Sequence, residues 1–203
     1  MLALRGSSFP IGLKIYLATA SSSAHATQPT PSLPFHTLSC NNTADHFPPC
    51  VTIPRMNFSR ITDDLFIGGM PSVSDYDLLR DLGVQLIISM RFSQAPKPDP
   101  HSPPIKILWL QSIDSPFFPL SVPKLIAGAN AALETIRDGG KVYAHCAYGR
   151  HRGVAMGACI LIAQGYDPQA AMRLIKERRP FADPFAFYIR PRILKFAKEW
   201  NHS

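Results

Sequence analysis

Short apolar runs alternate with longer helical patterns along the chain from about residue 60 onward. Four runs have the length and apolar character of buried strands: those around Phe66 and at 86–88, 105–110 and 141–144. Apolar residues follow one helical stripe over 122–136, and the stretch 154–163 is apolar enough for a buried helix. This order predicts an α/β fold with a central, mostly parallel sheet flanked by helices.

Residues that start or stop helices support this order of elements. Ser74 can cap a short helix that Gly83 ends. After the buried helix, Asp167 followed by Pro168 is a start signal for another helix.

A last helix is expected near the C-terminal end of the chain. Asp183 followed by Pro184 suits its first turn. Tyr188 and Trp200 would then belong to its apolar stripe, and the usual place of such a stripe is the core.

Residues 1–54 differ in composition from the rest of the chain. Prolines recur between 29 and 54 among Ser, Thr and Ala, and no acidic residue precedes Asp45. Such a segment cannot bury enough apolar surface to offset the entropy of ordering. We therefore expect a disordered tail at 1–54 and one folded domain at 55–203. Arg5, Lys14 and the many small residues leave an N-terminal targeting segment as an alternative.

The stretch 145–153, His-Cys-Ala-Tyr-Gly-Arg-His-Arg-Gly, places five residues between a cysteine and an arginine. It joins a predicted strand to a predicted helix. Backbone N–H groups in such a connection can turn inward and form an anion site, which the helix N-terminus reinforces. The spacing therefore predicts a phosphate-binding loop between Cys146 and Arg152.

Each residue type in this stretch suits phosphate chemistry. A cysteine attacks as the thiolate, which the nearby positive charge of Arg150, His151 and Arg152 favours. The planar guanidinium of Arg152 can bind two phosphate oxygens at once. Gly149 permits a backbone turn that a Cβ would obstruct. The alternative, a buried cysteine beside solvated arginines, requires neither the spacing nor the basic run.

Phosphoryl transfer to a cysteine also requires an acid that protonates the departing oxygen. Asp114 is the first candidate, because it follows the apolar run 105–110, and the prolines after it indicate a loop that can face the nucleophile. Without the cysteine loop, a turn or capping aspartate would be the better interpretation of Asp114. Asp183 is the second candidate, although Pro184 favours a helix start there.

The His-Cys-five-residues-Arg element resembles the active-site loop of the protein-tyrosine phosphatase superfamily, in particular its dual-specificity branch. The resemblance spans roughly Asn57 to Trp200. Its other matching pieces are the stretch from Arg60 to Pro71, and Leu82-Gly83-Val84 followed by Ile87-Ile88-Ser89. It implies a cysteine-dependent phosphatase that hydrolyses phosphotyrosine, phosphoserine or phosphothreonine in proteins through a phosphocysteine intermediate.

The resemblance also implies roles for individual residues. Cys146 would attack phosphorus, Arg152 would hold the equatorial oxygens, and Asp114 would protonate the leaving group and then activate water. His145 would order the loop and favour the thiolate by hydrogen bonding. The phosphate-binding loop would consist of Ala147, Tyr148, Gly149, Arg150, His151 and Gly153. No metal and no cofactor is needed.

Two departures from the family pattern affect this interpretation. The family usually has Ser or Thr after the arginine, where the hydroxyl helps phosphoenzyme breakdown, whereas this chain has Gly153. Our hypothesis is that Gly153 slows hydrolysis of the intermediate more than its formation, and a phosphate-binding pseudophosphatase is the corresponding alternative. The basic triplet 150–152 is similar to that of phosphatases acting on inositol pyrophosphates, so inositol polyphosphates and pyrophosphates are alternative substrates.

Composition restricts the remaining possibilities. With 203 residues and 46% hydrophobic content, the chain suits one catalytic domain. A formal charge of +7 suits an enzyme that attracts anionic phosphate esters, and no motif favours nucleic acid. No apolar run is long enough to span a bilayer. Four cysteines do not indicate a disulfide scaffold, and a reactive Cys146 favours the cytoplasm.

Other classes and sites fit less well. A sulfurtransferase loop is usually shorter, and an arsenate reductase needs a resolving cysteine, for which only Cys159 is near. A set of His and Cys residues in the tail could in principle bind Zn²⁺ but lacks the paired short spacings of common zinc fingers: His36, Cys40, His46 and Cys50. The oligomeric state is left open.

Overall fold

The computed structural model describes residues 14–16 and 56–202. The described residues form a six-stranded sheet with the strand order β1-β5-β4-β6-β3-β2. The strands are β1 (Lys14–Tyr16), β2 (Phe58–Arg60), β3 (Leu65–Gly68), β4 (Val84–Ser89), β5 (Lys106–Trp109) and β6 (Lys141–His145). The four inner strands are parallel, and β1 and β2 pair antiparallel at the two edges. The predicted α/β fold with a mostly parallel sheet is therefore confirmed.

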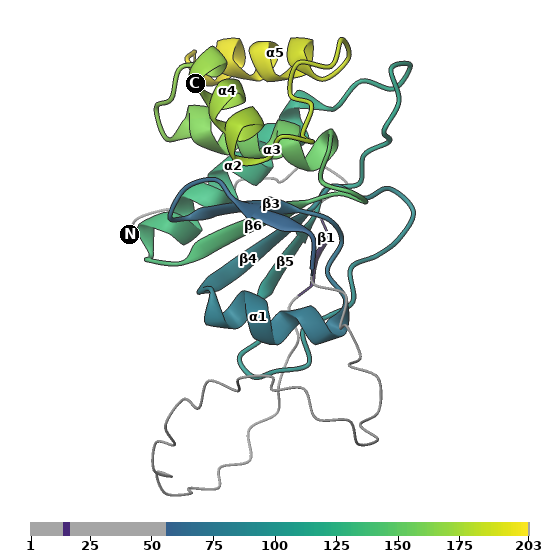
Figure 1. Ribbon diagram of the computed structural model, residues 1–203, viewed down its shortest axis with the longest axis vertical. Coiled ribbons are helices and arrows are strands. Elements are labelled where there is room, and N and C mark those ends of the chain that lie inside the picture. The colour runs from purple at the N-terminus through teal and green to yellow at the C-terminus, as the bar shows by residue number, and fades with distance from the viewer. Residues whose placement is uncertain (1–13, 17–55, 203) are drawn as a thin grey trace, which may run out of the picture. The chain divides into compact units, whose positions relative to one another are not determined.

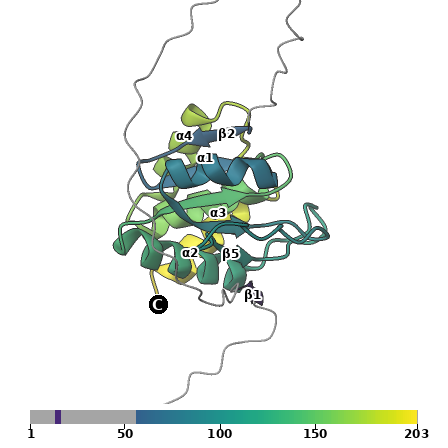
Figure 2. The same cartoon turned by 90° about the horizontal axis from the view of Figure 1, so that it is seen from below.

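Helices cover both faces of this sheet. They are α1 (Tyr76–Asp81), α2 (Val122–Arg137), α3 (Arg152–Ala163), α4 (Pro168–Arg178) and α5 (Arg190–Trp200), with a 3-10 turn at Val73–Asp75 before α1. Helix α1 lies on one face, and α2 to α5 lie on the other (Figures 1 and 2). The phosphate-binding loop that the sequence predicts between Cys146 and Arg152 is the connection between β6 and α3.

Alternation along the strands produces one apolar core on each face. In β6, Val142 and Ala144 belong to the larger core with α2 to α5, whereas Tyr143 belongs to the smaller core beneath α1. Leu65 and Phe66 in β3 divide in the same way. Because β6 is an inner strand buried on both faces, its C-terminal end is held firmly where the nucleophile follows.

Two helix starts differ from the sequence prediction. Ser72, not Ser74, precedes the first helical turn, where its backbone N–H donates to the Asp75 carboxylate at 2.7 Å. The last helix begins at Arg190 instead of at Pro184, because a series of turns occupies 183–189. Tyr188 therefore lies before α5, although its ring still packs against the larger core. Asp167 caps α4 as predicted, accepting from the N–H groups of residues 169 and 170.

The predicted tail is described only at β1, which pairs with β5. The remainder of 1–54 lies outside the described residues, and so do the four candidate zinc ligands and Arg5 of the possible targeting segment. The boundary at residues 54 and 55 stays a prediction. Among the described residues, no helix combines the length and apolar character needed to cross a membrane.

Candidate active site

Cys146 lies directly after β6 and is 2% exposed. Helix α3 begins at Arg152, so its N-terminus lies at the far end of the five-residue connection 147–151, which we call the phosphate loop. The first N–H groups of a helix have no partner within it and attract anions. The local fold therefore presents a buried thiol and a helix N-terminus around one short loop.

The carbonyl groups of the phosphate loop are all bound by surrounding groups. Ala147 accepts from the Met70 N–H, and Arg150 accepts from the Asp183 N–H at 2.9 Å. The Tyr148 and Gly149 carbonyls both accept from one arginine, and the His151 carbonyl accepts within the first turn of α3. None of the backbone N–H groups from 147 to 152 donates to a described residue. The carbonyls of the loop thus point outward to their partners, and its N–H groups are available to donate to an anion.

Arg179 is the residue that fixes the middle of this loop, and the sequence analysis missed it. It is 3% exposed; its Nε donates to the Gly149 carbonyl at 2.9 Å and its Nη2 to the Tyr148 carbonyl at 3.0 Å. Nη2 also donates to Asn57 Oδ1 at 2.9 Å. Arg179 follows α4 in a run of charged residues, where nothing in the local sequence distinguishes it from its exposed neighbours.

Two glycines allow the loop to approach its neighbours closely. Gly149 has φ +66°, and a Cβ there would collide with the Gly68 carbonyl. A Cβ at Gly153 would lie 3.0 Å from the His145 carbonyl carbon and 3.1 Å from the Cys146 nitrogen. Gly153 therefore lets α3 begin against the backbone that carries the nucleophile.

Arg152 is nearly buried and is oriented by two backbone carbonyls. Its Nη1 donates to Ser112 O at 2.6 Å and to Met90 O at 3.1 Å. These carbonyls follow β5 and β4 respectively, so the ends of two parallel strands hold the guanidinium beside the loop.

Asp114 lies in the loop after β5, and its side chain approaches Arg152 and His151. Its Oδ2 lies 3.4 Å from Arg152 Nε and 3.4 Å from His151 Nδ1, and its Oδ1 accepts from the Tyr188 hydroxyl at 2.9 Å. The structure thus brings Asp114 against Arg152, at the end of the loop that Cys146 begins; these are the three residues predicted to be catalytic. The rival acid, Asp183, contacts the loop through its backbone N–H.

His145 is fully buried in β6 and stacks on Tyr143. Its Nδ1 lies 3.2 Å from the Cys146 carbonyl, which can only accept, so Nδ1 carries the proton in the neutral ring. Burial lowers the pKa of His145 from its ordinary 6.5 to about 4. His145 is therefore neutral at physiological pH, and the hydrogen bond it makes is to the nucleophile's backbone.

This buried imidazole predicts a loss of stability in mild acid. Because the pKa of His145 is near 4 in the folded protein and near 6.5 when unfolded, the unfolded chain binds more protons between these values. The contribution of neutral His145 to the free energy of unfolding should be complete above pH 6.5. The free energy of unfolding should then fall by up to about 3 kcal/mol as the pH drops to 4. Urea unfolding at several pH values measures this.

The matched variants separate His145 from other titrating groups. His145→Gln should flatten the fall in unfolding free energy, whereas His202→Gln, at an exposed position after α5, should leave it as in the wild type. Equal pH dependence in all three proteins would contradict the assignment.

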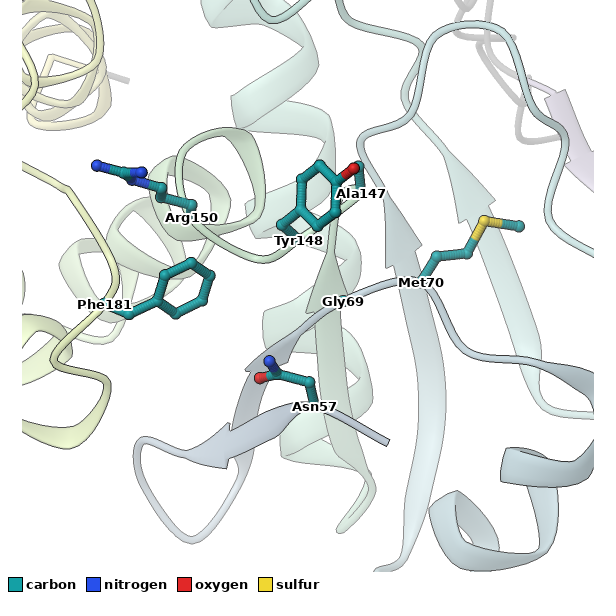
Figure 3. Close-up of a pocket in the computed structure, with 7 residues that line it drawn as sticks. All are labelled: Asn57, Gly69, Met70, Ala147, Tyr148, Arg150 and Phe181. Atoms are coloured by element: carbon teal, nitrogen blue, oxygen red, sulfur yellow. The ribbon is translucent and has the colours of Figure 1, made fainter. Parts of the chain in front are cut away.

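A pocket of about 400 Å³ lies beside the phosphate loop (Figure 3). Its lining residues are Asn57, Gly69, Met70, Ala147, Tyr148, Arg150 and Phe181. The side chains of Tyr148, Arg150 and Phe181 lie around it, and Tyr148 is 77% exposed. Within residues 14–16 and 56–202, no group of three or more His, Cys, Asp or Glu side chains could hold a metal ion.

Comparison with known proteins identifies the family. No protein-family model matches the chain. The chain is 30% identical over 129 residues to dual specificity phosphatase 28 of Mus musculus, covering 63% of this chain and 76% of that protein. It is 28% identical over 142 residues to human dual specificity protein phosphatase 8, covering 67% of this chain and 21% of that longer protein.

A solved structure supports the same relationship. A mouse protein described as a candidate dual-specificity phosphatase, solved in complex with zinc tungstate, superposes with a TM-score of 0.63 at 25% identity and covers 79% of this chain and 94% of its own. The fold and the relatives define a member of the protein-tyrosine phosphatase superfamily. The chain belongs to its dual-specificity phosphatase branch. It is a phosphatase, a hydrolase of phosphoric monoesters, and its substrates are phosphorylated.

Proposed function

We propose that this phosphatase acts in two steps through a phosphocysteine on Cys146. The phosphate loop carries the proposal, because its carbonyls are bound outward while its N–H groups have no partner among the described residues. Donors arranged in this way match the oxygens of a phosphoryl group, and the N-terminus of α3 adds favourable potential. The tungstate complex of the mouse neighbour agrees with this, since tungstate is also a tetrahedral oxyanion.

In the first step, the Cys146 thiolate attacks phosphorus. The sulfur–phosphorus bond forms, the bond from phosphorus to the ester oxygen breaks, and protonated Asp114 gives its proton to that oxygen. Arg152 stabilises the charge on the transferring oxygens, because its guanidinium is oriented before substrate binds. The alcohol or phenol then leaves.

In the second step, water attacks the phosphocysteine. The Asp114 carboxylate takes a proton from the water, the new oxygen–phosphorus bond forms, and the sulfur–phosphorus bond breaks to give inorganic phosphate and the thiolate. Gly153 offers no hydroxyl to assist the departing sulfur. We propose that this step is the slower one, so that the intermediate accumulates.

Rapid mixing with a small aryl phosphate tests both points. We expect a burst of phenol close to one equivalent per enzyme, followed by slower turnover. Acid quenching with radiolabelled substrate should place the phosphate on the peptide that contains Cys146. The variant Cys159→Ala, altered inside α3, should keep both signals. Label on another residue, or turnover with neither a burst nor a labelled peptide, would contradict the proposal.

For the substrate, we propose phosphorylated proteins instead of inositol polyphosphates or pyrophosphates. The pocket beside the phosphate loop has Met70, Tyr148 and Phe181 in its walls, with Arg150 as a charged group. Aromatic and apolar walls suit a peptide side chain next to the phosphoresidue better than an inositol ring that carries only phosphates. Comparison of kcat/KM for phosphopeptides and inositol polyphosphates tests this, and a preference for the inositol compounds would overturn it.

The remaining assignments concern the rest of the chain. We propose that residues 55–203 form the catalytic domain and that 1–54, apart from the strand β1 that pairs with β5, is a disordered tail. We also propose a reducing, cytoplasmic compartment, because the reaction requires Cys146 as a free thiolate.

A further inference from the structure

The loop that carries Asp114 has few contacts of its own. Its ends are anchored, since the Ser112 hydroxyl donates to the Met90 carbonyl at 2.8 Å and Arg192 Nε donates to the Leu120 carbonyl at 2.6 Å. Between them, Phe117 and Phe118 are largely exposed. Among the described residues, the backbone there makes only two local hydrogen bonds, from the Phe117 N–H to Ser115 Oγ at 3.2 Å and from the Phe118 N–H to the Ser115 carbonyl at 3.3 Å. Packing of the loop itself therefore does little to orient the Asp114 side chain.

The two oxygens of the Asp114 carboxyl group have different surroundings. Oδ1 accepts a hydrogen bond from the Tyr188 hydroxyl at 2.9 Å. Oδ2 faces Arg152 Nε and His151 Nδ1, both at 3.4 Å, which is beyond a good hydrogen bond. Oδ2 thus faces the phosphate loop through these two longer contacts, and Arg152 Nε beside it has no hydrogen-bond partner among the described residues.

We propose that Tyr188 is a positioning residue of the phosphatase reaction, whose hydroxyl holds Oδ1 of Asp114 so that Oδ2 exchanges the proton with the leaving group and with water. The inference rests on the function proposed above. With Oδ1 accepting from Tyr188, the proton of neutral Asp114 resides on Oδ2, the oxygen that faces the site.

The surroundings of Tyr188 suit this role. Its ring packs edge-to-face on His151 with centroids 5.5 Å apart and contacts the larger core. These contacts hold the hydroxyl in place, although Tyr188 lies in the connection that leads into α5. Burial and the Asp114 hydrogen bond raise the pKa of Tyr188, which keeps the hydroxyl protonated as a donor throughout an assay. Tyr188→Phe removes the hydroxyl and keeps the ring contacts.

The test compares kcat/KM for two aryl phosphates, because this constant reports the steps up to the first irreversible one. Phenyl phosphate has a basic leaving group that needs an acid, whereas p-nitrophenyl phosphate needs little help. Tyr188→Phe should lower kcat/KM for phenyl phosphate about tenfold, the scale of one hydrogen bond to a charged group, and change that for p-nitrophenyl phosphate by less than about threefold.

A double variant shows whether Tyr188 acts through Asp114. In the Asp114→Asn background, Tyr188→Phe should cause no further loss on phenyl phosphate, because the acid is already gone. Tyr166→Phe, which removes an exposed hydroxyl in the turn before α4, should behave as wild type.

The outcomes separate the two proposals. A wild-type protein inactive on both esters would defeat the proposed function. An active wild type with equal losses on both esters in Tyr188→Phe, no loss on either, or fully additive losses in the double variant would defeat the role of Tyr188 alone.

Discussion

Replacement of Cys146 by serine should abolish phosphate release while leaving phosphate binding intact. Serine fits the buried position, but its hydroxyl is a far weaker nucleophile than a thiolate. Removal of an enzymatic nucleophile costs about three orders of magnitude in kcat or more. Phosphate release from p-nitrophenyl phosphate, with phosphopeptide binding measured on the same protein, checks both parts.

The other described cysteine provides the matched control for this experiment. Cys159 is fully buried within α3, and burial raises the pKa of its thiol, so it cannot replace the nucleophile. Cys159→Ala should therefore keep its activity. If wild type and Cys146→Ser are equally inert and still bind the phosphopeptide, the loop is a phosphate reader, and Gly153 becomes the first residue to examine.

Replacement of Arg152 by lysine should lower kcat/KM by about 10²- to 10³-fold, although the positive charge is kept. The guanidinium is oriented by the carbonyls of Ser112 and Met90, both of which accept from Nη1. The ammonium group of lysine has neither the planar fork nor the reach to bind these carbonyls and two phosphate oxygens together. Steady-state kinetics on p-nitrophenyl phosphate measures the loss.

The loss must be distinguished from general damage to the fold. Arg173→Lys makes the same chemical change on the exposed side of α4, away from the phosphate loop, and should retain wild-type kinetics. Urea unfolding of Arg152→Lys shows whether the two lost hydrogen bonds also reduce stability. If kcat/KM of a folded Arg152→Lys protein stays within about threefold of wild type, Arg152 does not hold the transferring phosphoryl group.

The strands and most helices were predictable because their signals are local. The inner strands are short apolar runs buried on both faces, and Gly83, Gly139 and Gly165 at the helix ends all have positive φ. The start of α5 was not predictable in this way. Asp183 and Pro184 look like a helix start. However, the Asp183 N–H donates a hydrogen bond to the Arg150 carbonyl, and the residues that follow form turns instead of a first helical turn.

The sequence by itself determined the phosphate loop, because five residues between Cys146 and Arg152, flanked by a strand and a helix, define a local geometry. The tertiary structure decided what supports that loop. Arg179 reaches the Gly149 carbonyl from 30 positions away, and Tyr188 reaches Asp114 from 74. Hydrogen bonds over such distances depend on how the elements after α3 pack against the sheet, and no residue pattern along the chain records that packing.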